Sequence, residues 1–183
     1  MKKQIRSSVF ETNSSSTHSI AISKAPVTVG KYISFNIGEY GWENDCVDIG
    51  DYLYTAILYA YSFEDAEEKV EHLKKVLNKY GVFYQFEEPE YRAYSNGEKY
   101  LDNGYIDHGE ECAEFVEAVL NDEDMLMRCL FGNSMVYTGN DNQDNRPDGC
   151  NIANEEYYDW GEDKMVVNPY HDPENYDYFY KGN

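Results

Sequence analysis

The amphipathic segment from Phe63 to Tyr80 places the strongest constraint on what this chain can fold into. Its apolar residues recur at spacings of three and four, and charged residues occupy the opposite face. Gly81 follows, as glycine often does where a helix ends, and residues 82–86 then alternate in the manner of a strand. The segment therefore predicts a helix with one buried face, followed directly by a strand.

Further helices are predicted on both sides of this segment. Asp51 is a good cap for a helix that continues to about Tyr61. A second amphipathic helix is expected over residues 109–120, and a short one begins at Asp122 or Glu123. The short helix should reach Leu130 and be closed by Gly132.

Alternating segments predict the strands. Residues 18–23 and 31–37 both alternate, and we expect them to pair as a hairpin on either side of Pro26. Further strands are expected over residues 46–49, 134–138 and 164–167. This order of elements favours an α+β fold with a mainly antiparallel sheet, two to four helices and an irregular acidic, aromatic C-terminal region.

The length of 183 residues fits one domain with three compositional parts. Residues 1–38 form a basic leader with the expected hairpin, residues 39–138 the α+β body, and residues 139–183 an acidic end rich in Tyr and Asn. The first part carries five basic and one acidic side chain, a net charge of +4, and residues 39–183 carry 10 basic and 34 acidic side chains, a net charge of −24. Such a field repels nucleic acid and attracts basic surfaces.

The location within the cell is inferred from the cysteines and the hydropathy. The four cysteines show no paired spacing, which favours reduced thiols in a cytoplasmic protein. The longest apolar run, residues 53–61, is much shorter than a membrane span, and the basic start lacks the apolar core of a secretory signal. We therefore expect no contact with a membrane.

Motifs for catalysis or metal binding are incomplete. His108 and Glu110 match half of a zinc deaminase signature, but no P-C-x-x-C completes it. The acidic loop at 139–149 lacks the spacing of a calcium-binding loop. We predict no catalytic residue, no metal and no cofactor, and hence a protein that is not an enzyme.

The run from Arg6 to Ser19 concentrates hydroxyl groups with one arginine and one histidine. Its side chains could hold the backbone in shape through local hydrogen bonds. Alternatively they could grip a nucleotide phosphate or activate a serine. The ligand-binding residues under this alternative are Arg6, Ser14, Ser15, Ser16 and His18.

The same run, R-S-x-V-F-E-T-N-S-S-S-T-H-S, resembles a group of proteins from phages and mobile elements of Gram-positive gut bacteria. In that setting a small, very acidic chain is similar in character to type II anti-CRISPR inhibitors. The resemblance implies a bacterial host cell and, as partner, a basic nucleic-acid-binding protein. The type II CRISPR nuclease with its guide RNA fits that description, because it holds nucleic acid in positively charged channels.

The leading hypothesis is therefore an inhibitor that blocks DNA binding or cleavage by the nuclease through an acidic surface, without contacting nucleic acid itself. Tyrosines interleaved with carboxylates favour such an interface in the C-terminal part. The predicted partner-binding residues are Asp141, Asp144, Asp148, Glu155, Glu156, Tyr157, Asp159, Glu162 and Asp163. Two alternatives remain: an enzyme or nucleotide binder that uses residues 6–19, and a phage accessory protein without an inhibitory role.

Overall fold

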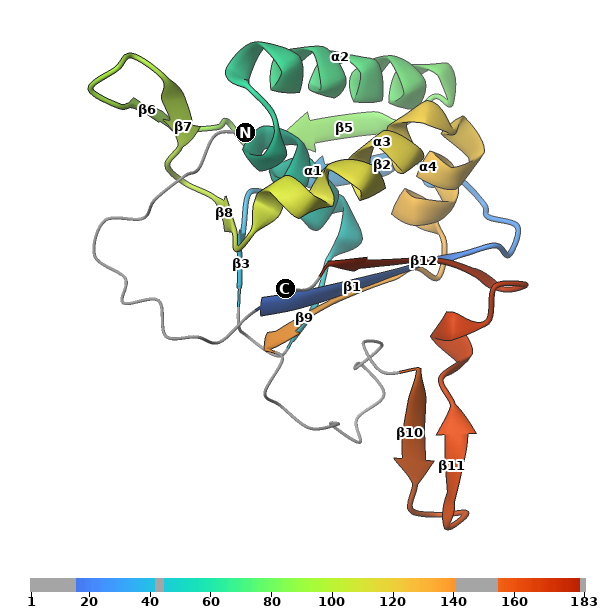
Figure 1. Ribbon diagram of the computed structural model, residues 1–183. Coiled ribbons are helices and arrows are strands. Elements are labelled where there is room, and N and C mark those ends of the chain that lie inside the picture. The colour runs from blue at the N-terminus through green and yellow to red at the C-terminus, as the bar shows by residue number, and fades with distance from the viewer. Residues whose placement is uncertain (1–15, 42–44, 141–154, 182–183) are drawn as a thin grey trace.

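The computed structural model describes residues 16–41, 45–140 and 155–181 of the chain. Within these ranges helices and short sheets form an α+β fold, as the sequence predicts. The helices gather on one side of a four-stranded sheet, and a β-hairpin lies at the opposite end of the molecule (Figure 1).

The four-stranded sheet is antiparallel throughout and has the order β12-β1-β9-β4. Its strands are β12 (Tyr176–Lys181), β1 (Ser16–Ser23), β9 (Met135–Asn140) and β4 (Asp45–Val47). Along β1, Ile20 and Ile22 join the main core, whereas Ala21 belongs to a smaller apolar cluster. Successive residues of a strand point to opposite faces of the sheet, so β1 contributes side chains to both apolar clusters.

The predicted hairpin between residues 18–23 and 31–37 is wrong. β1 takes its partners from the C-terminal third of the chain, and β2 (Tyr32–Phe35) pairs in parallel with β5 (Phe83–Phe86). This register places Phe35 against Phe86, with their rings stacked and the centroids 4.5 Å apart. The apolar burial that it provides for Phe35 outweighs the advantage of a local turn.

The two longest helices agree with the prediction, apart from one cap. α2 (Phe63–Lys79) begins after Ser62, whose hydroxyl accepts a hydrogen bond from the backbone N–H of Asp65. α1 (Ile49–Ala60) begins one turn earlier than expected, because Asp48 rather than Asp51 accepts hydrogen bonds from the first free N–H groups. Nine of its residues are buried, so α1 is the central helix of the core.

The predicted helix over residues 109–120 consists of two parts. A 3₁₀ turn, η1 (Gly109–Cys112), precedes α3 (Ala113–Asn121). α4 (Glu123–Phe131) is capped by Asp122 and ends at Gly132, which confirms both predicted boundaries.

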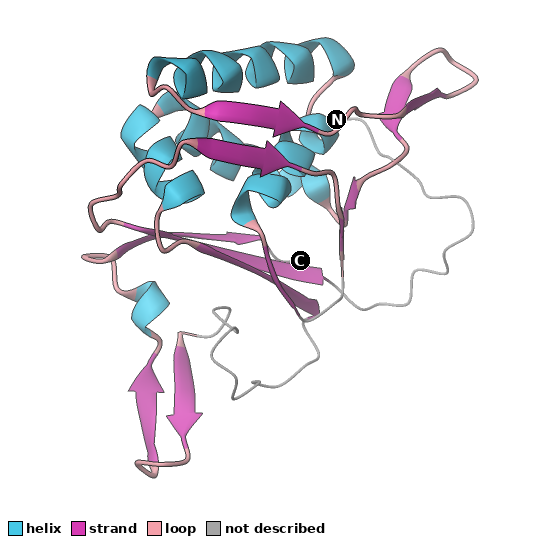
Figure 2. Cartoon of the chain, turned by 180° about the vertical axis from the view of Figure 1, so that it is seen from behind, coloured by secondary structure: helices cyan, strands magenta, loops and turns pink. Residues whose placement is uncertain are grey.

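Short elements complete the structure (Figure 2). They are the parallel pair β3 (Glu39–Tyr40) and β8 (Tyr105–Ile106), the hairpin of β6 (Tyr91–Ala93) and β7 (Lys99–Leu101), the hairpin of β10 (Glu156–Asp159) and β11 (Lys164–Val167), and the 3₁₀ turn η2 (Pro169–His171). The C-terminal region is thus more regular than its composition suggested. Across the described residues, every helix is too short or too polar to cross a bilayer.

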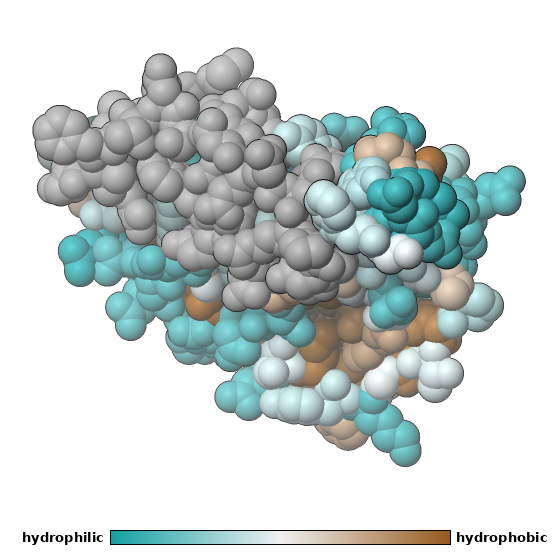
Figure 3. Space-filling model, turned by 90° about the horizontal axis from the view of Figure 1, so that it is seen from below, coloured by the Kyte–Doolittle hydropathy of each residue, from teal (hydrophilic) through white to brown (hydrophobic). Residues whose placement is uncertain are grey.

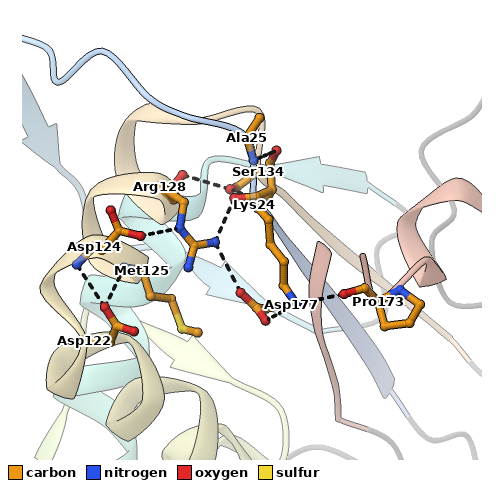
Figure 4. Close-up of polar contacts among 10 residues, drawn as sticks. Lys24, Ala25, Asp122, Asp124, Met125, Arg128, Ser134, Pro173 and Asp177 are labelled. Atoms are coloured by element: carbon orange, nitrogen blue, oxygen red, sulfur yellow. Dashed lines mark hydrogen bonds and ion pairs between the residues drawn. The ribbon is translucent and has the colours of Figure 1, made fainter. Parts of the chain in front are cut away.

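Ion pairs fix β12 in the sheet (Figure 4). Arg128 on α4 donates to the Ser23 carbonyl oxygen at 2.9 Å and to an Asp177 carboxylate oxygen at 3.2 Å. Lys24 donates to the same carboxylate at 3.1 Å and to the Pro173 carbonyl oxygen at 2.8 Å. The Arg128 side chain is mostly buried, so its own bonds are shielded from water. Together with the more exposed contacts of Lys24, they link α4, the end of β1 and the start of β12.

Candidate protein-binding site

The β10–β11 hairpin projects away from the helices at the end of the molecule (Figures 1 and 2). Its two strands form a sheet of their own. At its base the Asn168 N–H donates to the Glu155 carbonyl oxygen at 2.7 Å, and the Asn168 side chain caps η2 through the Tyr170 N–H. Ring contacts of Tyr170 with Tyr176 and of His171 with Tyr178 then hold η2 against β12.

The sequence at the tip determines the turn. An Asp159 carboxylate oxygen accepts hydrogen bonds from Gly161 N–H at 2.8 Å and Glu162 N–H at 3.2 Å. Asp163 has a φ of +53°, in the left-handed region that Asp tolerates better than most residues. Short polar side chains thus close the turn and leave Trp160 at its outer edge, where 81% of the residue is exposed.

One face of the hairpin is apolar and open to solvent. Tyr158 lies directly opposite Met165, and Glu156 lies opposite Val167 on the same face. Met165 is 55% and Val167 58% exposed, and the Trp160 ring packs edge-on against Tyr158 with 4.8 Å between centroids. Seen from the side to which the hairpin points, hydrophobic and strongly hydrophilic residues lie next to one another (Figure 3).

Carboxylates surround this apolar face. Residues 155–167 carry five acidic side chains and one lysine, a net charge of −4. Lys164 pairs with Glu162. The Tyr158 hydroxyl donates to the Asp163 carboxylate, and this hydrogen bond raises the pKa of Tyr158. The hairpin therefore combines apolar contact area with a concentrated negative charge.

The structure brings together six of the nine predicted partner-binding residues. These six are Glu155, Glu156, Tyr157, Asp159, Glu162 and Asp163, all on this hairpin or at its base. Asp141, Asp144 and Asp148 lie outside the described residues, as do residues 141–149 of the loop considered for calcium, whose first two residues end β9. The prediction omitted Trp160, Met165 and Val167. The strand predicted over residues 164–167 could have revealed the last two, because alternation places them on one face.

The residues predicted for ligand binding do not form an open site in the described chain. Ser16 and His18 are fully buried in β1, and Arg6, Ser14 and Ser15 lie outside the described residues. His18 Nδ1 lies 2.7 Å from the Tyr52 hydroxyl, which in turn lies 3.3 Å from Cys112 Sγ. Burial raises the pKa of Tyr52 well above its usual value. This chain of polar contacts joins β1, α1 and η1 inside the core.

The remaining candidates for chemistry are dispersed. Among the residues that the structure describes, no three His, Cys, Asp or Glu side chains are grouped so that they could hold a metal ion. His108 is an exposed turn residue with a φ of +53° before η1, and Cys129 is a buried thiol whose pKa is raised by desolvation. Of the two predicted sets of site residues, the partner-binding set is the one that the structure brings together at an exposed surface, on the hairpin. No protein-family model, curated protein or solved structure matches this chain.

Proposed function

We propose that this protein acts by binding another protein, and that the hairpin of residues 155–167 is its contact surface for a partner with a cationic, partly apolar face. The observation that carries the proposal is the exposure of Trp160, Met165 and Val167 on an element that also holds five carboxylates. Aromatic and apolar side chains exposed together are typical of protein interfaces.

The physical chemistry of the hairpin supports this role. A two-stranded sheet is at best marginally stable by itself in water. A partner that covers the apolar side chains of the hairpin would stabilise it, because their surface would be removed from water. The net charge of −4 on this segment, within a chain of net charge −20, accelerates encounter with a basic surface and disfavours an acidic one.

We propose the type II RNA-guided nuclease, loaded with its guide RNA, as the first partner to test. Its channels for nucleic acid are positively charged, and an acidic surface that occupies one of them would exclude DNA. In this mechanism the protein makes and breaks no covalent bond, and it acts in the cytoplasm of the bacterial host.

The experiment compares three forms of the full chain in two assays. In the first, each form is the bait that captures proteins from a bacterial lysate; in the second, each form is added to a DNA-cleavage reaction of the nuclease. The first is the unmodified protein. The second carries Glu155→Gln, Glu156→Gln and Glu162→Gln in the hairpin. The third, a control with the same change of charge, carries Glu90→Gln, Glu114→Gln and Glu174→Gln, which are exposed positions outside the hairpin.

We expect the hairpin variant to lose at least ten times more partner affinity than the control, and Trp160→Ala to cause a similar loss at raised salt, where charge is screened. Equal behaviour of the two glutamine variants would refute a role for the hairpin. Unchanged DNA cleavage at saturating concentrations of the unmodified protein would exclude the nuclease as partner.

A further inference from the structure

We propose a second binding site, distinct from the hairpin: a groove along α2 that takes an extended peptide rich in arginine or lysine. The groove has a volume of about 920 Å³ and lies between α2 and the segment that follows β5. Tyr54, Leu58 and Phe86 contribute apolar surface to it, and Phe63 and Tyr91 pack edge-on against each other in its lining. An aromatic groove of this volume is large enough to hold several side chains of a bound chain.

Six glutamates and two lysines, Lys74 and Lys75, line the groove, so its lining has a net charge of −4. Glu71 pairs with Lys74 at 2.7 Å, and the Glu87 carboxylate accepts a hydrogen bond from the Ile37 N–H at 2.7 Å. Among the residues that the structure describes, the other four make no hydrogen bond or ion pair through their carboxylates: Glu64, Glu67, Glu68 and Glu88. These four exposed carboxylates lie beside the aromatic side chains of the groove and outnumber Lys75, so the lining keeps an excess of negative charge that complements a cationic ligand.

The aromatic rings of the groove already accept ammonium groups from the protein itself. Lys99 Nζ lies 3.9 Å from the centroid of the Phe63 ring, and Lys74 Nζ lies 5.5 Å from the centroid of the Phe86 ring. Both distances fall within the range of cation–π attraction. The rings of the groove are thus suited to cations, and an arginine or lysine of a partner would compete with Lys74 and Lys99 for them.

The spacing of the carboxylates fits an extended chain. Glu64, Glu67 or Glu68, and Glu71 lie on successive turns of α2, and each step of three or four residues rises about 5–6 Å. Alternate side chains of an extended peptide are about 6.6 Å apart on one face. From Phe63 to Lys75 the helix rises about 18 Å, which corresponds to five or six extended residues. A peptide with a basic residue at every second position would therefore place one charge near each turn.

The groove and the hairpin lie at opposite ends of the molecule, with α2 at the top and β10–β11 at the bottom of Figure 1. A short peptide cannot bridge them, so the two sites can be tested separately. Each also serves as a control for the other, because both are acidic and aromatic.

The test measures the affinity of a fluorescein-labelled peptide, Arg-Ala-Arg-Ala-Arg-Ala, for the full chain by anisotropy at about 0.15 M salt. The groove variant carries Glu64→Gln, Glu67→Gln and Glu68→Gln. The matched variant carries Glu155→Gln, Glu156→Gln and Glu162→Gln in the hairpin, and so has the same net charge. Circular dichroism checks that all three proteins are folded.

We expect the groove variant to bind the peptide at least tenfold more weakly than the unmodified protein, and the hairpin variant to lose less than threefold. Equal losses would mean that the peptide responds only to net charge, and a larger loss in the hairpin variant would place it at the hairpin; either result overturns the proposal. Absence of measurable binding to the unmodified protein would overturn it as well, without affecting the function proposed for the hairpin.

Discussion

Strands β1 and β10 have opposite relations between composition and burial. Five of the eight residues of β1 are Ser, Thr or His, and yet all eight are buried. β10 holds two tyrosines between acidic residues, and yet three of its four residues are exposed and the fourth is half-buried. Side-chain polarity alone would have placed much of β1 at the surface.

The number of neighbouring strands explains the difference. β1 lies between β12 and β9, so both of its edges are paired and its faces are covered by the core and by the smaller apolar cluster around Tyr137. Its polar groups are tolerated there because they find hydrogen-bonding partners, such as Tyr52 for His18 and Tyr178 for Ser19. Within the described ranges β10 pairs with β11 alone, and its two tyrosines are exposed.

The largest expected effect is on core packing. Ile22→Ala removes a fully buried side chain from β1 and should lower the free energy of unfolding by about 2–5 kcal/mol. Val167→Ala shortens a side chain on the hairpin that is 58% exposed, and should change the free energy of unfolding by less than about 0.5 kcal/mol. Urea denaturation of both variants measures the contrast; similar losses would mean that the hairpin is packed as tightly as β1.

The buried polar contacts should give the next largest effect. Tyr52→Phe removes the hydroxyl between His18 and Cys112 and should cost about 1–3 kcal/mol of stability, because buried polar groups lose a hydrogen-bonding partner. Tyr157→Phe makes the same chemical change on the exposed hairpin and should leave thermal stability unchanged. If Tyr52→Phe were neutral in calorimetry, the polar contacts of β1 would contribute nothing to folding.

Ion pairs should also contribute more to stability in the four-stranded sheet than on the exposed hairpin. Asp177→Asn weakens the contacts of β12 with Arg128 and Lys24, and we expect a loss of about 1–2 kcal/mol in urea denaturation. Glu162→Gln breaks the exposed pair with Lys164 and should have no measurable effect. Increased hydrogen exchange of the β12 amides in Asp177→Asn alone would locate the loss at the edge of the sheet.

The smallest effect concerns pH. Hydrogen bonds from Lys69, and then from Tyr61, lower the pKa of the largely exposed Glu117 below its usual 4.5. A lowered folded-state pKa stabilises the protein above pH 4.5, and this contribution disappears as the pH falls through the folded-state value. Thermal melts of Glu117→Gln should therefore lie slightly below those of the unmodified protein at pH 7 and converge with them in acid. A constant difference at all pH values would contradict this assignment.

The candidate binding surface was predictable in part. The interleaving of carboxylates and tyrosines in residues 155–163 identified the hairpin, since composition alone indicates where charge and aromatic area coincide. The apolar partner strand with Met165 and Val167 was omitted, because their exposure depends on the hairpin standing apart from the sheet. The groove along α2 was not foreseen, because its aromatic residues come from four separate elements, α1, α2, β5 and β6.

Local patterns determined the helices and six of the twelve strands in the part of the chain that the structure describes, because periodicity acts over a few neighbouring residues. α2 and α4 follow their sequence patterns closely, and Asp122 and Gly132 flank α4 as predicted, whereas Ser62 as the cap of α2 was not predicted. Only the tertiary structure decided strand pairing. β1 pairs with a strand some 160 residues away instead of its neighbour in sequence, because the choice depends on which register buries the most apolar area across the whole chain.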